Sequence, residues 1–113
     1  MKRDVVITPR AKAQIRNAAA WWAENRSSHQ AALWLNRIEV AITALEVEAE
    51  RHLLAVESEA FSFELRQKLF GISGKRTHRI LFSIHEHHIV VYAVRHLAQQ
   101  NLTPDDLEDF IPS

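Results

Sequence analysis

Residues 63–84 read FELRQKLFGISGKRTHRILFSI, and this stretch decides the fold. Apolar and polar side chains alternate on both sides of the short segment Gly71–Lys75, which contains both glycines of the chain. Alternation with a period of two is typical of a β-strand, and clustered glycines indicate a turn. The stretch therefore predicts two antiparallel strands, one from Phe63 to Phe70 and one from Arg76 to Ile84.

A third strand is expected directly after this pair. Residues Ile89–Arg95 are mostly Val, Ile and Tyr, which favour extended structure, and His85–His88 forms a short polar connection before them. Consecutive strands joined by short turns form an antiparallel meander.

The N-terminal half predicts a short strand at Val5–Ile7 and then two antiparallel helices. Thr8 and Pro9 form a helix start, because Thr caps the free N–H groups and Pro lacks an N–H that would need a partner. Ser27 with Gln30 three residues later fits a capping box that opens a second helix, which we expect to fray near Glu50. The expected apolar stripes are Ile15, Ala18, Ala19 and Trp22 on the first helix, and Leu35, Ile38, Ile42 and Leu45 on the second.

These elements predict a single α+β domain over residues 1–113, with the order β-α-α-β-β-β. The helical hairpin is expected on one face of a small, mainly antiparallel sheet, and the other face is expected to stay open for a partner. Arg51–Phe61 is interpreted as a connection with some buried apolar contacts. The tail Pro104–Phe110 is interpreted as a short acidic helical turn capped by Thr103.

Composition narrows the class of protein. The chain has 113 residues, 47% of them hydrophobic, and no cysteine, which excludes disulfides, thiolate metal ligands and thiol chemistry. The longest apolar runs are far shorter than the ~20 residues that span a bilayer, so we expect a soluble cytoplasmic protein with no membrane partner. We predict neither a cofactor nor a metal, because His85-Glu86-His87-His88 fits a polar hairpin tip better than a set of converging ligands.

The net charge of zero hides a strongly alternating charge pattern. Residues 65–96 carry six Lys or Arg and one Glu, and acidic segments lie on both sides of them. Clustered guanidinium groups suit phosphate, and His96 has a side chain whose ordinary pKa suits proton transfer near neutral pH. We expect these cations to converge on the open face of the meander; the alternative is an ordinary solvated sheet face. The set is Arg66, Lys68, Lys75, Arg76, Arg79 and Arg95, with His96.

Three tryptophans lie on the predicted helices. Trp22 is expected in the core, and Trp21 and Trp34 are expected either between the helices or against a partner.

Three segments of the second half are similar to the RelE/ParE superfamily of toxins from type II toxin–antitoxin (plasmid stabilisation) systems. They are ELRQKLFG at residues 64–71, RTHRILF at 76–82 and IVVYAVRH at 89–96, and LTPDDL at 102–107 resembles one plasmid-stabilisation subgroup. The superfamily has a strand, a helical hairpin and an antiparallel meander, which is the order expected above.

The resemblance implies one of two activities. RelE-like members cut messenger RNA on the ribosome with basic residues and no metal, whereas ParE-like members poison DNA gyrase and are not nucleases. By position, the resemblance implies catalytic roles for Arg79, Arg95 and His96. Nucleic-acid binding is expected of Arg66, Lys68, Lys75 and Arg76.

Ribosome-dependent mRNA cleavage is the first hypothesis, gyrase inhibition the second, and a non-toxic antitoxin-binding module the third. The catalytic tyrosine that some RelE-like members carry after the last strand has no counterpart here. Each hypothesis implies a cognate antitoxin as partner, and the first two add the ribosome with mRNA or DNA gyrase as the target. We expect the antitoxin to fold on binding, laying an apolar face on this chain and neutralising its cations with acidic residues.

Overall fold

Four strands form a single sheet in the order β1-β4-β3-β2 in the computed structural model, which describes residues 2–107. The strands are β1 (Asp4–Ile7), β2 (Arg66–Phe70), β3 (His78–Ile84) and β4 (His88–His96). Strands β2, β3 and β4 pair antiparallel in chain order, which confirms the predicted meander. Strand β1 pairs parallel to β4, so the sheet is mixed but mainly antiparallel, as the sequence predicts.

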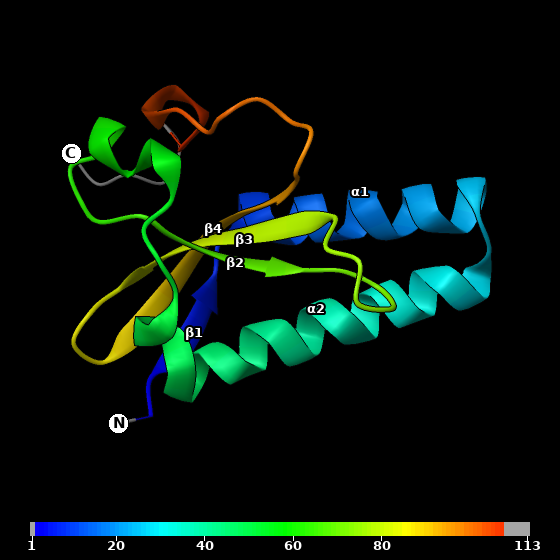
Figure 1. The fold of residues 1–113 in the computed structure, drawn as a ribbon, viewed down its shortest axis with the longest axis horizontal. Coiled ribbons are helices and arrows are strands. Elements are labelled where there is room, and N and C mark those ends of the chain that lie inside the picture. Colours follow the sequence, from blue (N-terminus) through cyan, green and yellow to red (C-terminus); the bar gives the residue numbers. More distant parts are fainter. Residues whose placement is uncertain (1, 108–113) are drawn as a thin grey trace.

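In chain order, two helices follow β1 and precede the meander, and each begins at its predicted cap. Helix α1 (Pro9–Asn25) begins after Thr8, whose Oγ1 accepts a hydrogen bond of 3.1 Å from the Ala11 N–H. Helix α2 (Ser28–Glu48) begins after Ser27, whose Oγ accepts one of 3.1 Å from the Gln30 N–H. The helices form a hairpin against one face of the sheet, as Figure 1 shows, and the fold class is the predicted α+β.

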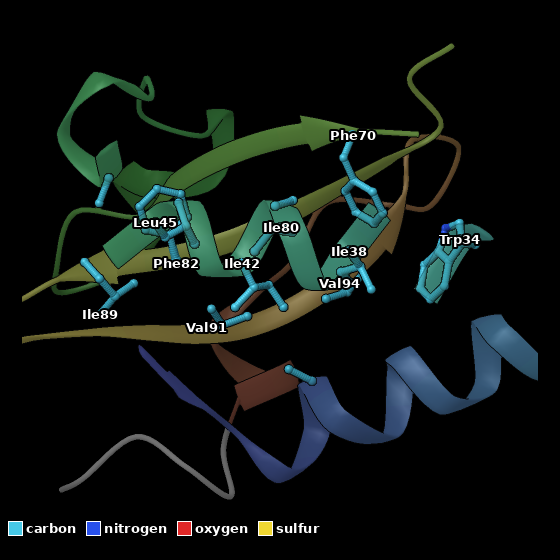
Figure 2. Close-up of a cluster of buried hydrophobic side chains, with 13 residues drawn as sticks. Trp34, Ile38, Ile42, Leu45, Phe70, Ile80, Phe82, Ile89, Val91 and Val94 are labelled. Atoms are coloured by element: carbon cyan, nitrogen blue, oxygen red, sulfur yellow. The ribbon is translucent and has the colours of Figure 1, made fainter. Parts of the chain in front are cut away.

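The main core lies between this hairpin and the sheet (Figure 2). The predicted stripe of α1 packs against it, and three of the four residues predicted for the stripe of α2, Ile38, Ile42 and Leu45, are buried there as well. Leu35 is 41% exposed, whereas Trp34 is fully buried beside Phe70. Trp34 lies four residues before Ile38, so the larger side chain occupies the core position that the sequence analysis wrongly gave to Leu35.

The second face of the sheet is covered, and the prediction that it stays open is wrong. Residues 53–65, which include the 3-10 turn η2 (Val56–Ala60), and residues 97–107, which end in η3 (Pro104–Leu107), pack on it (Figure 1). Their apolar side chains meet the strands in a second core. Its buried members are Ala55, Leu65, Leu81, Val90, Tyr92, Ala93, Leu102 and Leu107.

The interpretation of the connection and the tail is therefore partly confirmed. The connection after α2 starts with η1 (Ala49–Arg51), close to the expected end of the helix. The acidic turn at Pro104 is present as η3, with the Asp106 carboxylate accepting hydrogen bonds from both the N–H and the hydroxyl of Thr103. The part of the predicted turn from residue 108 to Phe110 lies outside the described residues. Within the described part of the chain, no helix is both long and apolar enough to cross a membrane.

Candidate functional site

An irregularity in β4 decides which faces Arg95 and His96 occupy. Leu81 pairs with Ala93 but Phe82 pairs with Val91, so Tyr92 is an extra residue in a β-bulge. A bulge of one residue reverses the alternation after it. We call the face under residues 53–65 and the tail, residues 97–107, the tail-covered face, and the face under α1 and α2 the helix-covered face. Arg95 shares the tail-covered face with Arg79, its partner in the register, whereas His96 shares the helix-covered face with His78.

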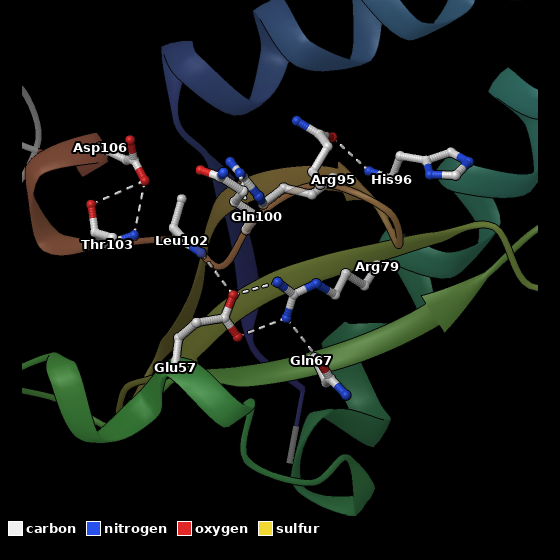
Figure 3. A network of polar contacts seen from close by, with 10 residues as sticks. Glu57, Gln67, Arg79, Arg95, His96, Gln100, Leu102, Thr103 and Asp106 are labelled. Carbon is white, nitrogen blue, oxygen red and sulfur yellow. Dashed lines mark hydrogen bonds and ion pairs between the residues drawn. The ribbon is translucent and has the colours of Figure 1, made fainter.

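On the tail-covered face, Arg79 is closed into a buried ion pair (Figure 3). Its Nη1 donates to Oε1 of Glu57 at 2.7 Å, its Nη2 donates to Oε2, and Nη1 also reaches Gln67. The Leu102 N–H donates to Oε2 of Glu57 at 2.9 Å, which ties the tail to the same carboxylate. The side chains of Arg79 and Glu57 are only 8% and 1% exposed. Solvent therefore has almost no access to either charge.

The pKa of Glu57 shows the balance of forces in this pair. Burial alone would raise the pKa, because the charged carboxylate loses its hydration. The hydrogen bonds from Arg79 and the Leu102 N–H more than offset the burial, so the pKa lies below its ordinary value. Glu57 is thus an ionised counter-ion for Arg79 at neutral pH.

Arg66 and Lys68 point to the opposite, helix-covered face. Lys68 donates from Nζ to the Ala41 carbonyl at 2.9 Å and pairs with the Glu48 carboxylate. Arg66 donates from Nη1 to the His52 carbonyl at 2.6 Å. The hydrogen bond from Lys68 outweighs partial burial and lowers the pKa of Glu48. The predicted convergence of Arg66 and Lys68 with Arg79 and Arg95 in one cationic pocket is therefore wrong.

Arg95 lies beside the tail and only partly in solvent. Its Nη2 donates to the Gln100 carbonyl at 2.7 Å, and its Nε is a buried donor with no hydrogen-bond partner among residues 2–107 (Figure 3). Arg95 thus lies on the same face as Arg79, but the two side chains have different partners. Arg95 donates to Gln100 in the tail, and Arg79 pairs with Glu57 in the connection after α2. The catalytic roles given to Arg79, Arg95 and His96 stay predictions.

His96 instead meets His78 at the end of the helix-covered face. Their ring centroids are 5.1 Å apart, with the rings nearly perpendicular. The Trp34 indole N–H donates to His78 Nδ1 at 3.4 Å, and the Thr77 hydroxyl lies 2.8 Å from the same nitrogen. Burial, with a smaller effect from His96, lowers the pKa of His78 to about 4. His78 is therefore neutral at physiological pH, and its Nε2 carries the proton.

A pocket of about 720 Å³ opens beside this histidine pair. The second half of α1, the β2–β3 loop and the ends of β3 and β4 surround it. Two tryptophans, two basic residues and both histidines line it. The lining residues with polar or aromatic side chains are Gln14, Asn17, Trp21, Trp22, Arg26, Lys75, Thr77, His78, His96 and Gln99.

The β2–β3 loop places Lys75 at this pocket. The loop doubles back so tightly that a Cβ on Gly71 would lie 1.7 Å from the Lys75 carbonyl oxygen, which only glycine avoids. Ser73 and Gly74 both adopt positive φ, 55° and 76°, which completes the reversal. Arg76 is exposed in the same loop but does not line the pocket. Of the predicted site residues, Lys75 and His96 are the ones that line this pocket.

Sequence reasoning did not identify Glu57 or Arg26, and it gave Trp21 two alternatives, a place between the helices or one against a partner. Glu57 lies in the acidic segment before residue 65, and nothing in the neighbouring sequence indicates that it pairs with Arg79, 22 positions away. Trp21 and Arg26 lie on the outer part of α1. The sequence did offer one signal for this region. Trp22 belongs to the apolar stripe of α1, so the adjacent Trp21 must point away from that stripe. For metals, no group of three or more His, Asp or Glu side chains within residues 2–107 is placed to hold an ion.

The order β1-α1-α2-β2-β3-β4, with a helical hairpin on one face of a small mixed sheet, defines a RelE/ParE-like toxin fold. A family model described as the ParE toxin of the type II toxin–antitoxin system parDE matches residues 5–101. The chain therefore belongs to the ParE toxin family, and this membership implies a cognate antitoxin as its partner. No curated protein matches the chain.

Proposed function

We propose that this toxin acts on DNA gyrase and does not cut RNA. The observation that carries the proposal is the closed Glu57–Arg79 pair. Arg79 occupies the strand position at which RelE-like nucleases use an arginine on the scissile phosphate. Here both Nη atoms are bound to the Glu57 carboxylate and the side chain is 8% exposed.

The other groups required for RNA cleavage are also dispersed. Metal-free cleavage at a phosphate requires cations around the developing negative charge and a proton acceptor within hydrogen-bond reach of the 2′-hydroxyl. Lys68 is held by Glu48 on the far side of the sheet from Arg79, and His96 is on that far side too. The single tyrosine of the chain, Tyr92, is buried. These features favour the ParE-type activity over the nuclease that the sequence analysis placed first.

One pair of assays on the same protein tests the proposal. The purified toxin is added to gyrase and plasmid DNA, and cleaved DNA is scored after detergent and protease treatment. In parallel, the toxin is added to a reconstituted translation reaction, and the message is mapped by primer extension. We expect cleaved plasmid DNA to accumulate and no new 5′ ends to appear in the message.

Variants separate the outcomes. Arg95→Met and His96→Gln remove two predicted catalytic groups, and exposed Arg37→Glu on α2 serves as the control for a change of charge elsewhere. New 5′ ends that are lost in Arg95→Met or His96→Gln but kept in Arg37→Glu would establish the nuclease. Unchanged supercoiling at a large excess of toxin would overturn the gyrase proposal.

A further inference from the structure

The pocket beside His78 and His96 combines cations, hydrogen-bond donors and indoles in its lining. Two cations, Arg26 and Lys75, line it, and no Asp or Glu of the described residues 2–107 is part of its lining. Within residues 2–107, neither cation forms an ion pair. By contrast, Lys68 and Arg79 have carboxylate partners. Positive potential therefore accumulates at this pocket, where no carboxylate of the lining neutralises it.

The uncharged groups of the lining also present donors. Gln14 accepts from the Val94 N–H at 2.8 Å, and Gln99 accepts from the His96 N–H at 2.7 Å. Their amide oxygens are thus occupied by backbone, which leaves their NH₂ groups as donors. His78 accepts at Nδ1 and so carries its proton on Nε2, a further donor. A ligand that suits this lining is rich in acceptors and negatively charged.

Two indoles add flat apolar surface to this donor-rich lining. Trp21 is 49% exposed and meets Trp22 edge to face, with ring centroids 5.5 Å apart. The Arg26 guanidinium lies 5.6 Å from the centroid of the Trp21 ring. Exposed indoles beside a guanidinium are the surface on which nucleic-acid bases stack.

We propose that this pocket binds a nucleoside phosphate. The base stacks on the exposed Trp21 indole and meets the perpendicular Trp22 ring edge to face, the phosphate is held by Arg26 and Lys75, and the amide NH₂ groups donate to acceptor atoms of the base. The volume of about 720 Å³ lies in the range of small-ligand sites, which is large enough for one nucleotide. The proposal does not depend on the cellular target, since the pocket belongs to the isolated chain.

Calorimetric titration of the purified toxin tests this assignment. The probes are adenosine 5′-monophosphate, adenosine, inorganic phosphate and a carboxylate-rich peptide. We expect the monophosphate to bind more tightly than adenosine or phosphate alone, because only the monophosphate engages both the indoles and the cations. Trp21→Ala is expected to weaken its binding by roughly 5- to 100-fold, the range for loss of one stacked base, and Trp21→Phe to restore part of it.

Matched variants make the test specific. Lys75→Glu is expected to weaken binding of the monophosphate and to reduce its dependence on salt, whereas Arg37→Glu makes the same change on the outer face of α2 and leaves both unchanged. Leu33→Ala, at another exposed apolar position of the hairpin, is the control for Trp21→Ala. Far-ultraviolet circular dichroism and the urea unfolding midpoint of each variant confirm that its fold is intact before titration.

Two further probes distinguish the source of the nucleotide. Tighter binding of a short single-stranded oligothymidylate, with the same sensitivity to Trp21→Ala, assigns the pocket to an unpaired nucleotide of a strand. Comparable binding of the monophosphate assigns it to a free nucleotide. The proposal is overturned if neither probe saturates the protein at about 1 mM. It is also overturned if the acidic peptide binds more tightly, or if Arg37→Glu weakens binding as much as Lys75→Glu.

Discussion

On the tail-covered face of the sheet, Arg79 is enclosed with Glu57, whose carboxylate also accepts from the Leu102 N–H. At the end of the helix-covered face, Lys75 and Arg26 line a pocket to which residues 2–107 contribute no carboxylate. Both regions use side chains from the meander and its loop, and both contain charges that the sequence groups into one basic segment. The difference is what the rest of the chain supplies. The connection after α2 provides Glu57 as the counter-ion of Arg79. Helix α1 provides the indoles and amide side chains that line the pocket.

This contrast shows that a cation's function depends on its partners more than on its position along a strand. A guanidinium that pairs in a bidentate manner with a buried carboxylate belongs to the protein interior. Its charge is neutralised there, and the pair links two segments of the chain. A cation without such a partner keeps its field available to a ligand. The next four experiments test this difference, beginning with the largest expected effect.

The buried pair is expected to be the most sensitive point of the tail-covered face. Glu57→Gln removes the negative charge and leaves the Arg79 guanidinium buried without a counter-ion. We expect the free energy of unfolding to fall by about 3–5 kcal/mol, measured by urea denaturation. The control is Glu64→Gln, because Glu64 is 73% exposed and lies 3.9 Å from Arg66, and its loss is expected to cost less than about 0.5 kcal/mol.

A double variant checks the cause of that loss. Glu57→Leu combined with Arg79→Met replaces both charges by apolar groups, so no charge is left buried alone. It is expected to be more stable than Glu57→Gln. Equal stability of Glu57→Gln and Glu64→Gln would show that the pair is not buried in solution.

The pH dependence of stability reports on the other region. The pKa of His78 is lowered to about 4, so between pH 6.5 and pH 4 the unfolded chain binds a proton that the folded chain does not. Stability therefore falls as the pH drops through this window, by about 3 kcal/mol if His78 acts alone. Glu48 and Glu57 have lowered pKa values, so their contributions are lost only at the acidic end, below about pH 4.5.

Comparison of two variants assigns this slope to His78. The pKa of His85 is also lowered, by burial and by His88, so part of the slope remains after any change at His78. His78→Gln is expected to flatten the curve of unfolding free energy against pH between pH 6.5 and 4.5. His29→Gln, at an exposed position of α2, is expected to leave the curve as in the wild type. A slope that is the same in both variants would contradict a buried neutral His78.

Lys68 gives a smaller effect, because its ion pair is only partly buried. Its side chain is 14% exposed and that of Glu48 is 19% exposed. Lys68→Met is expected to cost about 1–2 kcal/mol in thermal or urea unfolding, through loss of a charge-assisted hydrogen bond. Lys2→Met is the matched control, since Lys2 is 72% exposed and 3.8 Å from Glu46, with an expected cost below about 0.5 kcal/mol. Equal costs for the two variants would place Lys68 in solvent.

The sequence predicted the elements of the fold well because their signals are local. The caps at Thr8 and Ser27, the glycine turn and the alternation of residues 63–84 each act within a few positions, and the structure has the caps, the turn and both strands. The strands are shorter than predicted, because β2 begins at Arg66 and β3 at His78. The sequence did not predict that Arg66 and Lys68 lie on the face opposite Arg79, because the register between β2 and β3 sets their relative facing and cannot be read from either strand alone. The β-bulge at Tyr92 likewise leaves no mark in the alternation of β4. The sequence analysis also missed the cover over the second face. The apolar residues of 53–65 and 97–107 follow neither a helical nor a strand period.

Arg95 is expected to give the smallest change in stability, which makes it the most useful residue for function. Arg95→Met loses one exposed hydrogen bond to the Gln100 carbonyl, a loss of about 1 kcal/mol at most, but it also removes a buried Nε that has no partner among residues 2–107. The two effects oppose each other, so the unfolding midpoint in urea is expected to stay close to that of the wild type. Arg79 offers no such separation, because any change there also removes a buried counter-ion. A loss of toxicity in Arg95→Met, with stability and antitoxin binding retained, would therefore show that this cation acts on the target. A large loss of stability would show instead that Arg95 holds the tail in place, as Glu57 does.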